Sequence, residues 1–181
     1  VDKTEQAKAQ LSSSAKAAVV METTSQRLLF AKNENQKLPM ASTTKIMTAI
    51  VMIEQIGVDR LTEEVVVDKE AAATVGSRLG LSTGDKITYN DLLYGLMLCS
   101  GNDAAVALAE YAGNDLKGFA ELMNKKADDL GLKNTNFETP HGLDADNHYT
   151  TAYELATLSN YALNNKTFTE IVGTKNYTIT I

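Results

Sequence analysis

The sequence predicts an α+β protein in which a short antiparallel hairpin precedes a run of helices. Two apolar runs, residues 17–21 and 27–31, flank a Thr-Thr-Ser turn and predict the hairpin. From Ser42 onward, apolar residues recur at helical spacing instead, at Ile46, Met47, Ile50, Ile53 and Ile56. Residues 177–181 alternate as Tyr-Thr-Ile-Thr-Ile, which predicts a final strand.

The first helix is bounded by residues that interrupt regular structure. Pro39 ends the polar linker before Ser42, and Gly57 stands where a helix commonly ends. Residues 1–15 are polar and predict a loose leader or a short helix. A short strand is expected at residues 65–67. These signals place the start of the first long helix at Ser42.

Capping residues predict where the later helices begin. Thr88 with Asp91 resembles a capping box, and Thr151 with Glu154 forms a second one before a helix that ends near residue 163. Asn102 is placed to cap a helix of its own. A further helix is expected over residues 115–130, followed by a long irregular loop over residues 132–150.

Length and composition narrow the class of protein. The 181 residues suffice for one domain. The formal charge of −6 comes without a basic patch, so nucleic acid is not expected as a partner. Cys99 is the only cysteine, which excludes an intrachain disulfide. The longest apolar stretches fall far short of the roughly 20 residues of a membrane helix. The chain begins with Val1, as expected for a processed or trimmed protein, and composition leaves the compartment open.

Ser42 and Lys45 form a Ser-x-x-Lys pattern at the start of the first helix. Residues three apart share a helix face, so the hydroxyl and the amine can meet. A lysine with its ordinary pKa of about 10.4 is protonated at neutral pH, but burial or a second cation lowers that pKa enough to make it a base. The alternative is a serine that caps a helix and a lysine that is solvated.

A second polar motif, Ser100-Gly101-Asn102, interrupts two apolar helices. In one interpretation it only breaks one helix and caps the next. In the other, Ser100 relays a proton and the amide of Asn102 binds a substrate carbonyl, which an amide can do because it carries both donor and acceptor groups. Ser-x-x-Lys followed by Ser-x-Asn is the order found in penicillin-binding proteins and serine β-lactamases.

The flanking segments sharpen that match. The sequence resembles the low-molecular-mass penicillin-binding proteins that are serine-type D-alanyl-D-alanine carboxypeptidases, and the resemblance covers about residues 16–165. It is carried by residues 38–48 (LPMASTTKIMT), 76–79 (GSRL), 96–105 (LMLCSGNDAA), 130–137 (LGLKNTNF) and 141–144 (HGLD). It implies a serine β-lactamase/transpeptidase-like fold, an antiparallel sheet flanked by helices with a mainly helical subdomain at about residues 62–150.

The resemblance also implies roles for four residues. Ser42 would be the nucleophile that forms an acyl-enzyme, and Lys45 its general base. Ser100 would relay a proton, and Asn102 would contact the substrate. The expected substrates are peptidoglycan stem peptides, and β-lactams would acylate the same serine. No cofactor or metal is implied. The expected location is outside the cytoplasm, with any membrane contact through a C-terminal anchor not present in this chain.

The family's third motif, Lys-Thr-Gly, does not occur in this sequence. Lys166-Thr167 is followed by Phe168, and Gly173-Thr174-Lys175 has the reverse order. We therefore expect residues 1–181 to form an incomplete catalytic domain whose C-terminal sheet strands lie beyond this chain. Loss of one oxyanion donor typically costs on the order of a hundredfold to a thousandfold in rate.

Three other interpretations compete with this one. His141, Asp144 and His148 could bind a metal, although their spacing matches no common zinc pattern. A class A-like β-lactamase would need a deacylating glutamate, for which Glu138 stands at a plausible distance. An inactive module that binds peptides or β-lactams would retain the cleft without turnover. A Ser-His-Asp triad is disfavoured because no Gly-x-Ser-x-Gly elbow is present.

Overall fold

The computed structural model describes residues 14–143 and 145–181, so the element predicted at residues 1–15 lies almost entirely outside the described residues. The strands are β1 (Ala18–Met21), β2 (Leu28–Lys32), β3 (Glu64–Val66) and β4 (Lys86–Thr88). The helices are α2 (Lys45–Ile56), α3 (Lys69–Ala73), α4 (Tyr89–Leu98), α5 (Asn102–Gly113), α6 (Leu116–Asp129), α7 (Ala152–Leu163) and α8 (Lys166–Gly173), with 3-10 turns at Ala41–Thr44 and Val58–Arg60. The predicted α+β class is confirmed.

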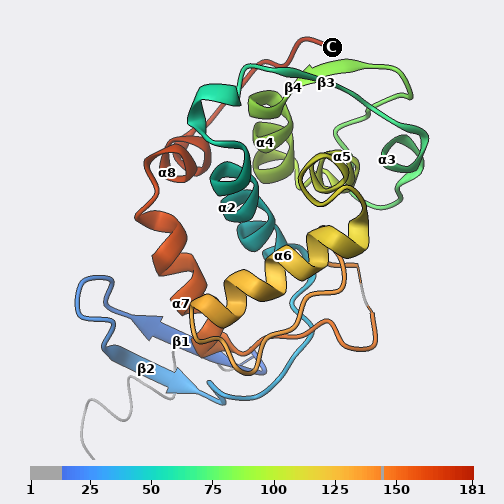
Figure 1. Cartoon of the computed structure of the whole chain (residues 1–181). Coiled ribbons are helices and arrows are strands. Elements are labelled where there is room, and N and C mark those ends of the chain that lie inside the picture. Colours follow the sequence, from blue (N-terminus) through green and yellow to red (C-terminus); the bar gives the residue numbers. More distant parts are fainter. Residues whose placement is uncertain (1–13, 144) are drawn as a thin grey trace, which may run out of the picture.

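Helix α2 is the central element of the fold. It contacts α4, α5, α6, α7 and α8, and Figure 1 shows these helices arranged around it, with the β1–β2 hairpin and the β3–β4 hairpin at opposite ends of the molecule. Its side chains are buried at every position from Met47 to Ile53. Because α2 is enclosed on most sides, any polar side chain on its first turn lies next to the core.

The β1–β2 hairpin is confirmed and antiparallel, with Val19 opposite Ala31 and an irregularity after Val20. Helix α7 packs against β1. Phe30 is buried in the core, whereas Val20 and Leu29 are 45% and 48% exposed. One face of this hairpin is therefore covered by helix and the other is open among the described residues.

The capping predictions are confirmed at two of the three helices concerned. Thr88 accepts a hydrogen bond from the backbone N–H of Asp91, and Thr151 accepts one from Glu154. Only half of the second capping box forms, because the carboxylate of Glu154 accepts instead from the backbone N–H of Asn134. That bond fastens the predicted irregular loop over residues 132–150 to the start of α7.

The predicted strand at residues 177–181 is wrong. Those residues pair with no strand in the part of the chain that the structure describes. Instead, the Tyr177 ring stacks on Tyr94 with 3.6 Å between ring centroids, and its hydroxyl donates to Asp91. Alternation of apolar residues specifies a strand only where an adjacent strand offers backbone partners. Helices α3 and α8 and strand β4 were not predicted.

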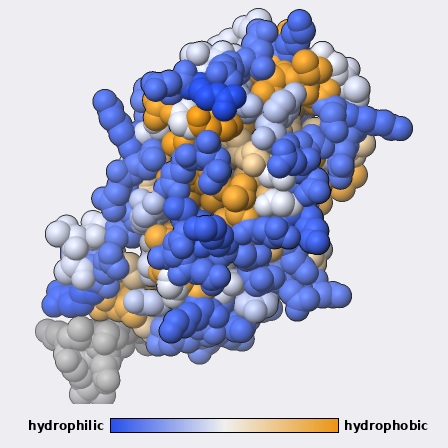
Figure 2. All heavy atoms as spheres, viewed as in Figure 1, coloured by the Kyte–Doolittle hydropathy of each residue, from blue (hydrophilic) through white to orange (hydrophobic). Residues whose placement is uncertain are grey.

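Apolar side chains also reach the surface. Figure 2 shows hydrophobic residues emerging in the middle of one face, between hydrophilic side chains, and Val58 and Val75 are more than 60% exposed.

None of the helices over residues 14–143 and 145–181 has both the length and the apolar character needed to span a membrane.

Candidate active site

Ser42 lies at the start of the central helix, in the 3-10 turn Ala41–Thr44 that leads into α2. Ser42 and Thr43 are exposed, whereas Thr44 and Lys45, which follow them, are buried. Pro39 precedes the short turn, and its first residue, Ala41, has a φ of 46° in the left-handed region. Ser42 is therefore open to solvent, whereas Thr44 at the end of the same turn and Lys45 after it face the core.

Lys45 is buried, with 2% of its surface exposed. Its Nζ lies 3.2 Å from the Oγ of Ser42, 2.7 Å from the Oδ1 of Asn102 and 2.8 Å from the carbonyl oxygen of His141. Burial lowers the pKa of Lys45 from 10.5 to about 8, against a small opposing influence from the Cys99 thiol. No carboxylate is among its three hydrogen-bond partners, so no opposite charge in direct contact offsets the effect of burial.

These three contacts define what the amine can do. A protonated amine uses its three N–H groups on the three oxygens. A neutral amine keeps two N–H groups, which the Asn102 and His141 oxygens can accept, and its lone pair then points toward the Ser42 hydroxyl. At pH 7 a pKa of about 8 leaves roughly a tenth of the lysine neutral. The arrangement can therefore remove a proton from Ser42.

Asn102 is the first residue of α5, and the prediction that its side chain caps this helix is wrong. Gly101 occupies the N-cap position without a side-chain cap. The Asn102 amide accepts from Lys45 through Oδ1 and donates through Nδ2 to the carbonyl of Val75, at 2.7 Å. The amide thus bridges Lys45 and the loop that carries Val75, and it does not cap the helix.

Ser100 lies between α4 and α5 and is partly exposed, with a φ of 57° in the left-handed region. Its hydroxyl makes none of the hydrogen bonds found within the described residues, whether to Ser42, to Lys45 or to Asn102. The structure thus joins Ser42, Lys45 and Asn102 by hydrogen bonds and leaves Ser100 outside that set. Its role as a proton relay stays a prediction.

The loop at residues 139–148 is the part of the site that sequence reasoning missed. It returns to α2 through three hydrogen bonds: Thr48 donates to the carbonyl of Pro140, Lys45 donates to the carbonyl of His141, and the Thr44 hydroxyl pairs with the His148 ring. The key acceptor is a main-chain oxygen, which every residue type carries. The sequence therefore held no signal for this contact.

The residues considered for a metal are engaged in loop contacts. The Nδ1 atom of His141 accepts from the backbone of Leu143, and the Nδ1 atom of His148 accepts from the backbone of Glu138. Burial, together with Lys45 and His148, lowers the pKa of His141 to about 4. Among the described residues, no three His, Cys, Asp or Glu side chains gather closely enough to hold a metal ion, and Asp144 lies outside that set. The exposed Glu138 carboxylate accepts from the backbone of Asn147.

The buried amine also predicts a pH dependence of stability. Between about pH 8 and pH 10.5 the unfolded chain holds more protons on Lys45 than the folded chain, so this residue makes stability rise with pH. Relative to a Lys45→Met variant, which cannot titrate there, the wild type should gain on the order of 2 kcal/mol between pH 7 and pH 10. Urea unfolding of both proteins at the two pH values measures this gain, and a constant difference would contradict it.

Comparisons with known proteins give this geometry its context. The chain is 38% identical over 167 residues to the D-alanyl-D-alanine carboxypeptidase DacF of Bacillus subtilis, an alignment that covers 91% of this chain and 43% of DacF. The chain thus spans less than half the length of that relative.

Two solved structures are also similar. Penicillin binding protein 6B from Escherichia coli matches with a TM-score of 0.85 and 39% identity, over 91% of this chain and 55% of that chain. A DD-transpeptidase from Streptomyces matches with a TM-score of 0.86 and 36% identity, over 90% of this chain and 66% of that chain. These matches confirm the expected transpeptidase-like fold. Over residues 3–181 the sequence fits the family described as D-alanyl-D-alanine carboxypeptidase, and the chain therefore belongs to that family.

Proposed function

We propose that this chain carries the nucleophile and the general base of a serine-type D-alanyl-D-alanine carboxypeptidase. Ser42 is the nucleophile, Lys45 the base and Asn102 a substrate contact, and Ser100 relays a proton to the leaving group. The substrates are the stem peptides of peptidoglycan, and β-lactams acylate the same serine. The enzyme acts in the cell envelope, outside the cytoplasm.

One observation carries this proposal. The Nζ of Lys45 is buried beside the exposed Ser42 hydroxyl and is held by two fixed acceptors, the Asn102 amide oxygen and the His141 carbonyl. A lysine on a solvent-exposed helix face would bind water instead of these two oxygens. Burying an amine without a carboxylate partner also lowers the stability of the fold. A general base next to a nucleophile is the function that makes use of it.

The chemistry follows from these positions. As the Oγ of Ser42 bonds to the carbonyl carbon of the penultimate D-alanine, its proton passes to the neutral Lys45. The backbone N–H of Ser42 stabilises the negative charge that develops on the carbonyl oxygen. The C–N bond then breaks, and the terminal D-alanine leaves with a proton from Lys45 relayed by Ser100. Water then attacks the ester carbon and gives its proton to Lys45. The bond between that carbon and the Oγ of Ser42 breaks, Lys45 returns the proton to Oγ, and the shortened peptide leaves.

The test is the intact mass of the chain after incubation with benzylpenicillin. We expect a single adduct with the mass of the opened β-lactam, and no adduct on a Ser42→Ala variant, because the serine oxygen is the atom acylated. An adduct that persists in the variant would exclude Ser42 as the nucleophile. Rapid turnover of penicillin without an adduct would instead favour a β-lactamase.

The adduct alone does not separate an enzyme from a binding module. Release of D-alanine from a synthetic peptide that ends in D-Ala-D-Ala, measured on a protein of DacF-like length that contains this chain, makes that distinction. We expect release that stops in Ser42→Ala. Acylation by penicillin without any release of D-alanine would identify a module that binds but does not turn over.

A further inference from the structure

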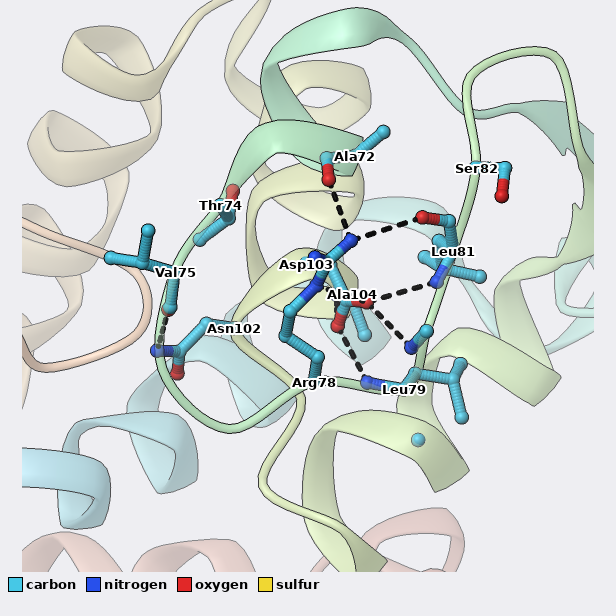
Figure 3. A network of polar contacts seen from close by, with 12 residues as sticks. Ala72, Thr74, Val75, Arg78, Leu79, Leu81, Ser82, Asn102, Asp103 and Ala104 are labelled. Carbon is cyan, nitrogen blue, oxygen red and sulfur yellow. Dashed lines mark hydrogen bonds and ion pairs between the residues drawn. The ribbon is translucent and has the colours of Figure 1, made fainter.

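Asp103 follows Asn102 on α5 and is completely buried. Its carboxylate accepts four backbone N–H groups: Oδ1 accepts from Leu79 and Ala104, and Oδ2 accepts from Gly80 and Leu81, at distances of 2.8–3.0 Å. Figure 3 shows three of these donors on one loop that curves around the carboxylate. The side chain therefore fixes the backbone of residues 79–81 against the start of α5.

The negative charge of Asp103 strengthens its hydrogen bonds to the backbone N–H groups of this loop. Burial alone would raise its pKa, but the four N–H donors outweigh burial and lower it, so the carboxylate is ionised at neutral pH. Arg78 lies beside it, with 3.7 Å between Nε and Oδ2, and donates to the carbonyl groups of Ala72 and Leu81. The ion pair and the backbone bonds hold the same loop.

The other end of that loop is joined to the active site through Asn102. The backbone N–H of Asn102 donates to the carbonyl of Ser77, and its Nδ2 donates to the carbonyl of Val75. The same amide offers its oxygen to Lys45. A Cβ atom on Gly76 would lie 2.6 Å from that Nδ2, so the loop backbone sits directly against the amide.

From these contacts we infer that Asp103 is a positioning residue for the acylation reaction. It holds residues 79–81, which keeps the carbonyl of Val75 in place, and that carbonyl orients the Asn102 amide so that its oxygen faces Lys45. The inference rests on the proposed function of Lys45 as the base. Asp103 itself touches neither Ser42 nor Lys45 among the contacts in the described residues.

The substitution Asp103→Asn tests the charge with little change of shape. An amide has only one acceptor oxygen, and each carboxylate oxygen serves two N–H donors. In either orientation, the new NH₂ group meets two backbone N–H groups that it cannot accept. Asp85→Asn is the matched control, because Asp85 accepts a single backbone N–H, from Ser82, in an exposed turn.

The first readout is solvent exchange of specific N–H groups, followed by NMR on the labelled chain. In Asp103→Asn we expect the backbone amides of residues 79–81 and the side-chain amide of Asn102 to exchange about tenfold faster or more. A merely structural role would speed exchange over the core as a whole. Unchanged exchange at the Asn102 side chain would overturn the inference, even if the chain takes no penicillin.

The second readout is the rate of adduct formation with benzylpenicillin. We expect roughly a hundredfold slower acylation in Asp103→Asn and wild-type rates in Asp85→Asn, because a small displacement of a catalytic group is costly. Faster exchange at Asn102 with an unchanged acylation rate would overturn the inference while leaving the proposed function intact. If neither this chain nor a protein of DacF-like length that contains it took an adduct, the proposed function would be rejected, and the exchange data would still decide the positioning.

A second variant covers the case in which Asp103→Asn does not fold. Gly76 lies in the exposed part of the loop. In Gly76→Ala the added methyl group would press on the Asn102 amide without contacting the four hydrogen bonds of Asp103. We expect it to speed exchange of the Asn102 side chain and to slow acylation. Wild-type behaviour in Gly76→Ala would show that the loop does not control Asn102, which would overturn the inference.

Discussion

Replacing Lys45 with arginine is expected to slow acylation by benzylpenicillin by about 10²- to 10⁴-fold. Arginine keeps a positive charge at this position but cannot be deprotonated in a protein, so it offers no lone pair to the Ser42 hydroxyl. If Lys45 served only as a cation, arginine would retain most of the rate. The measurement is the rate of adduct formation by mass spectrometry, with Lys37→Arg as the control on an exposed lysine.

The wild-type rate should also depend on pH in a defined direction. Because the proposed mechanism uses the neutral amine, acylation should rise about tenfold per pH unit below the Lys45 pKa of about 8 and level off above it. In Lys45→Arg this rise should disappear. A wild-type rate that is flat between pH 6 and pH 8 would show that the proton goes elsewhere.

Replacing Gly142 with alanine is expected to destabilise the fold by about 2–5 kcal/mol and to abolish acylation. Gly142 has a φ of 89°, and a Cβ atom there would collide with the carbonyl of Ala41 and lie 2.8 Å from the Oγ1 of Thr44. To relieve the clash, the loop must move away from the first turn of α2. The carbonyl of His141 then leaves Lys45.

Gly84→Ala is the matched control for this prediction. Gly84 has a φ of 93°, and an added Cβ would meet nothing within 4 Å. It should cost only the backbone strain, about 1–2 kcal/mol, and leave acylation unchanged. Urea unfolding and adduct formation measure both variants. Equal losses of stability in the two variants would mean that the close packing of Gly142 against Ala41 adds nothing to the cost of the Gly142→Ala substitution.

The sequence predicted those parts of the fold that short segments specify by themselves. The hairpin, the helix that begins near Ser42, and the caps at Thr88 and Thr151 each depend on a few adjacent residues. The strand predicted at residues 177–181 was wrong because a strand also needs the edge of another strand, from a distant part of the sequence, to pair with. Asn102 failed as a cap because its tertiary partners, Lys45 and Val75, compete for the same amide.

The site was predictable to the same extent. The spacing of Ser42 and Lys45 predicted their contact, and the family resemblance identified Asn102 as a candidate site residue. Two contributions carried no sequence signal: the His141 carbonyl, because it belongs to the main chain, and the buried Asp103, because its partners are backbone N–H groups. The role of Ser100 and the subdomain boundaries at about residues 62–150 stay predictions.

The contacts that complete the site join residues far apart along the chain. Lys45 receives its acceptors from positions 57 and 96 residues later, and Thr44 meets His148 across 104 residues. Contacts of this range form late in folding, because they must overcome the entropy of closing long loops. During synthesis, which proceeds from the N-terminus, Ser42 and Lys45 emerge long before residue 141. Under the proposed mechanism, Lys45 can therefore act as the base for Ser42 only after His141 and His148 have reached the start of α2.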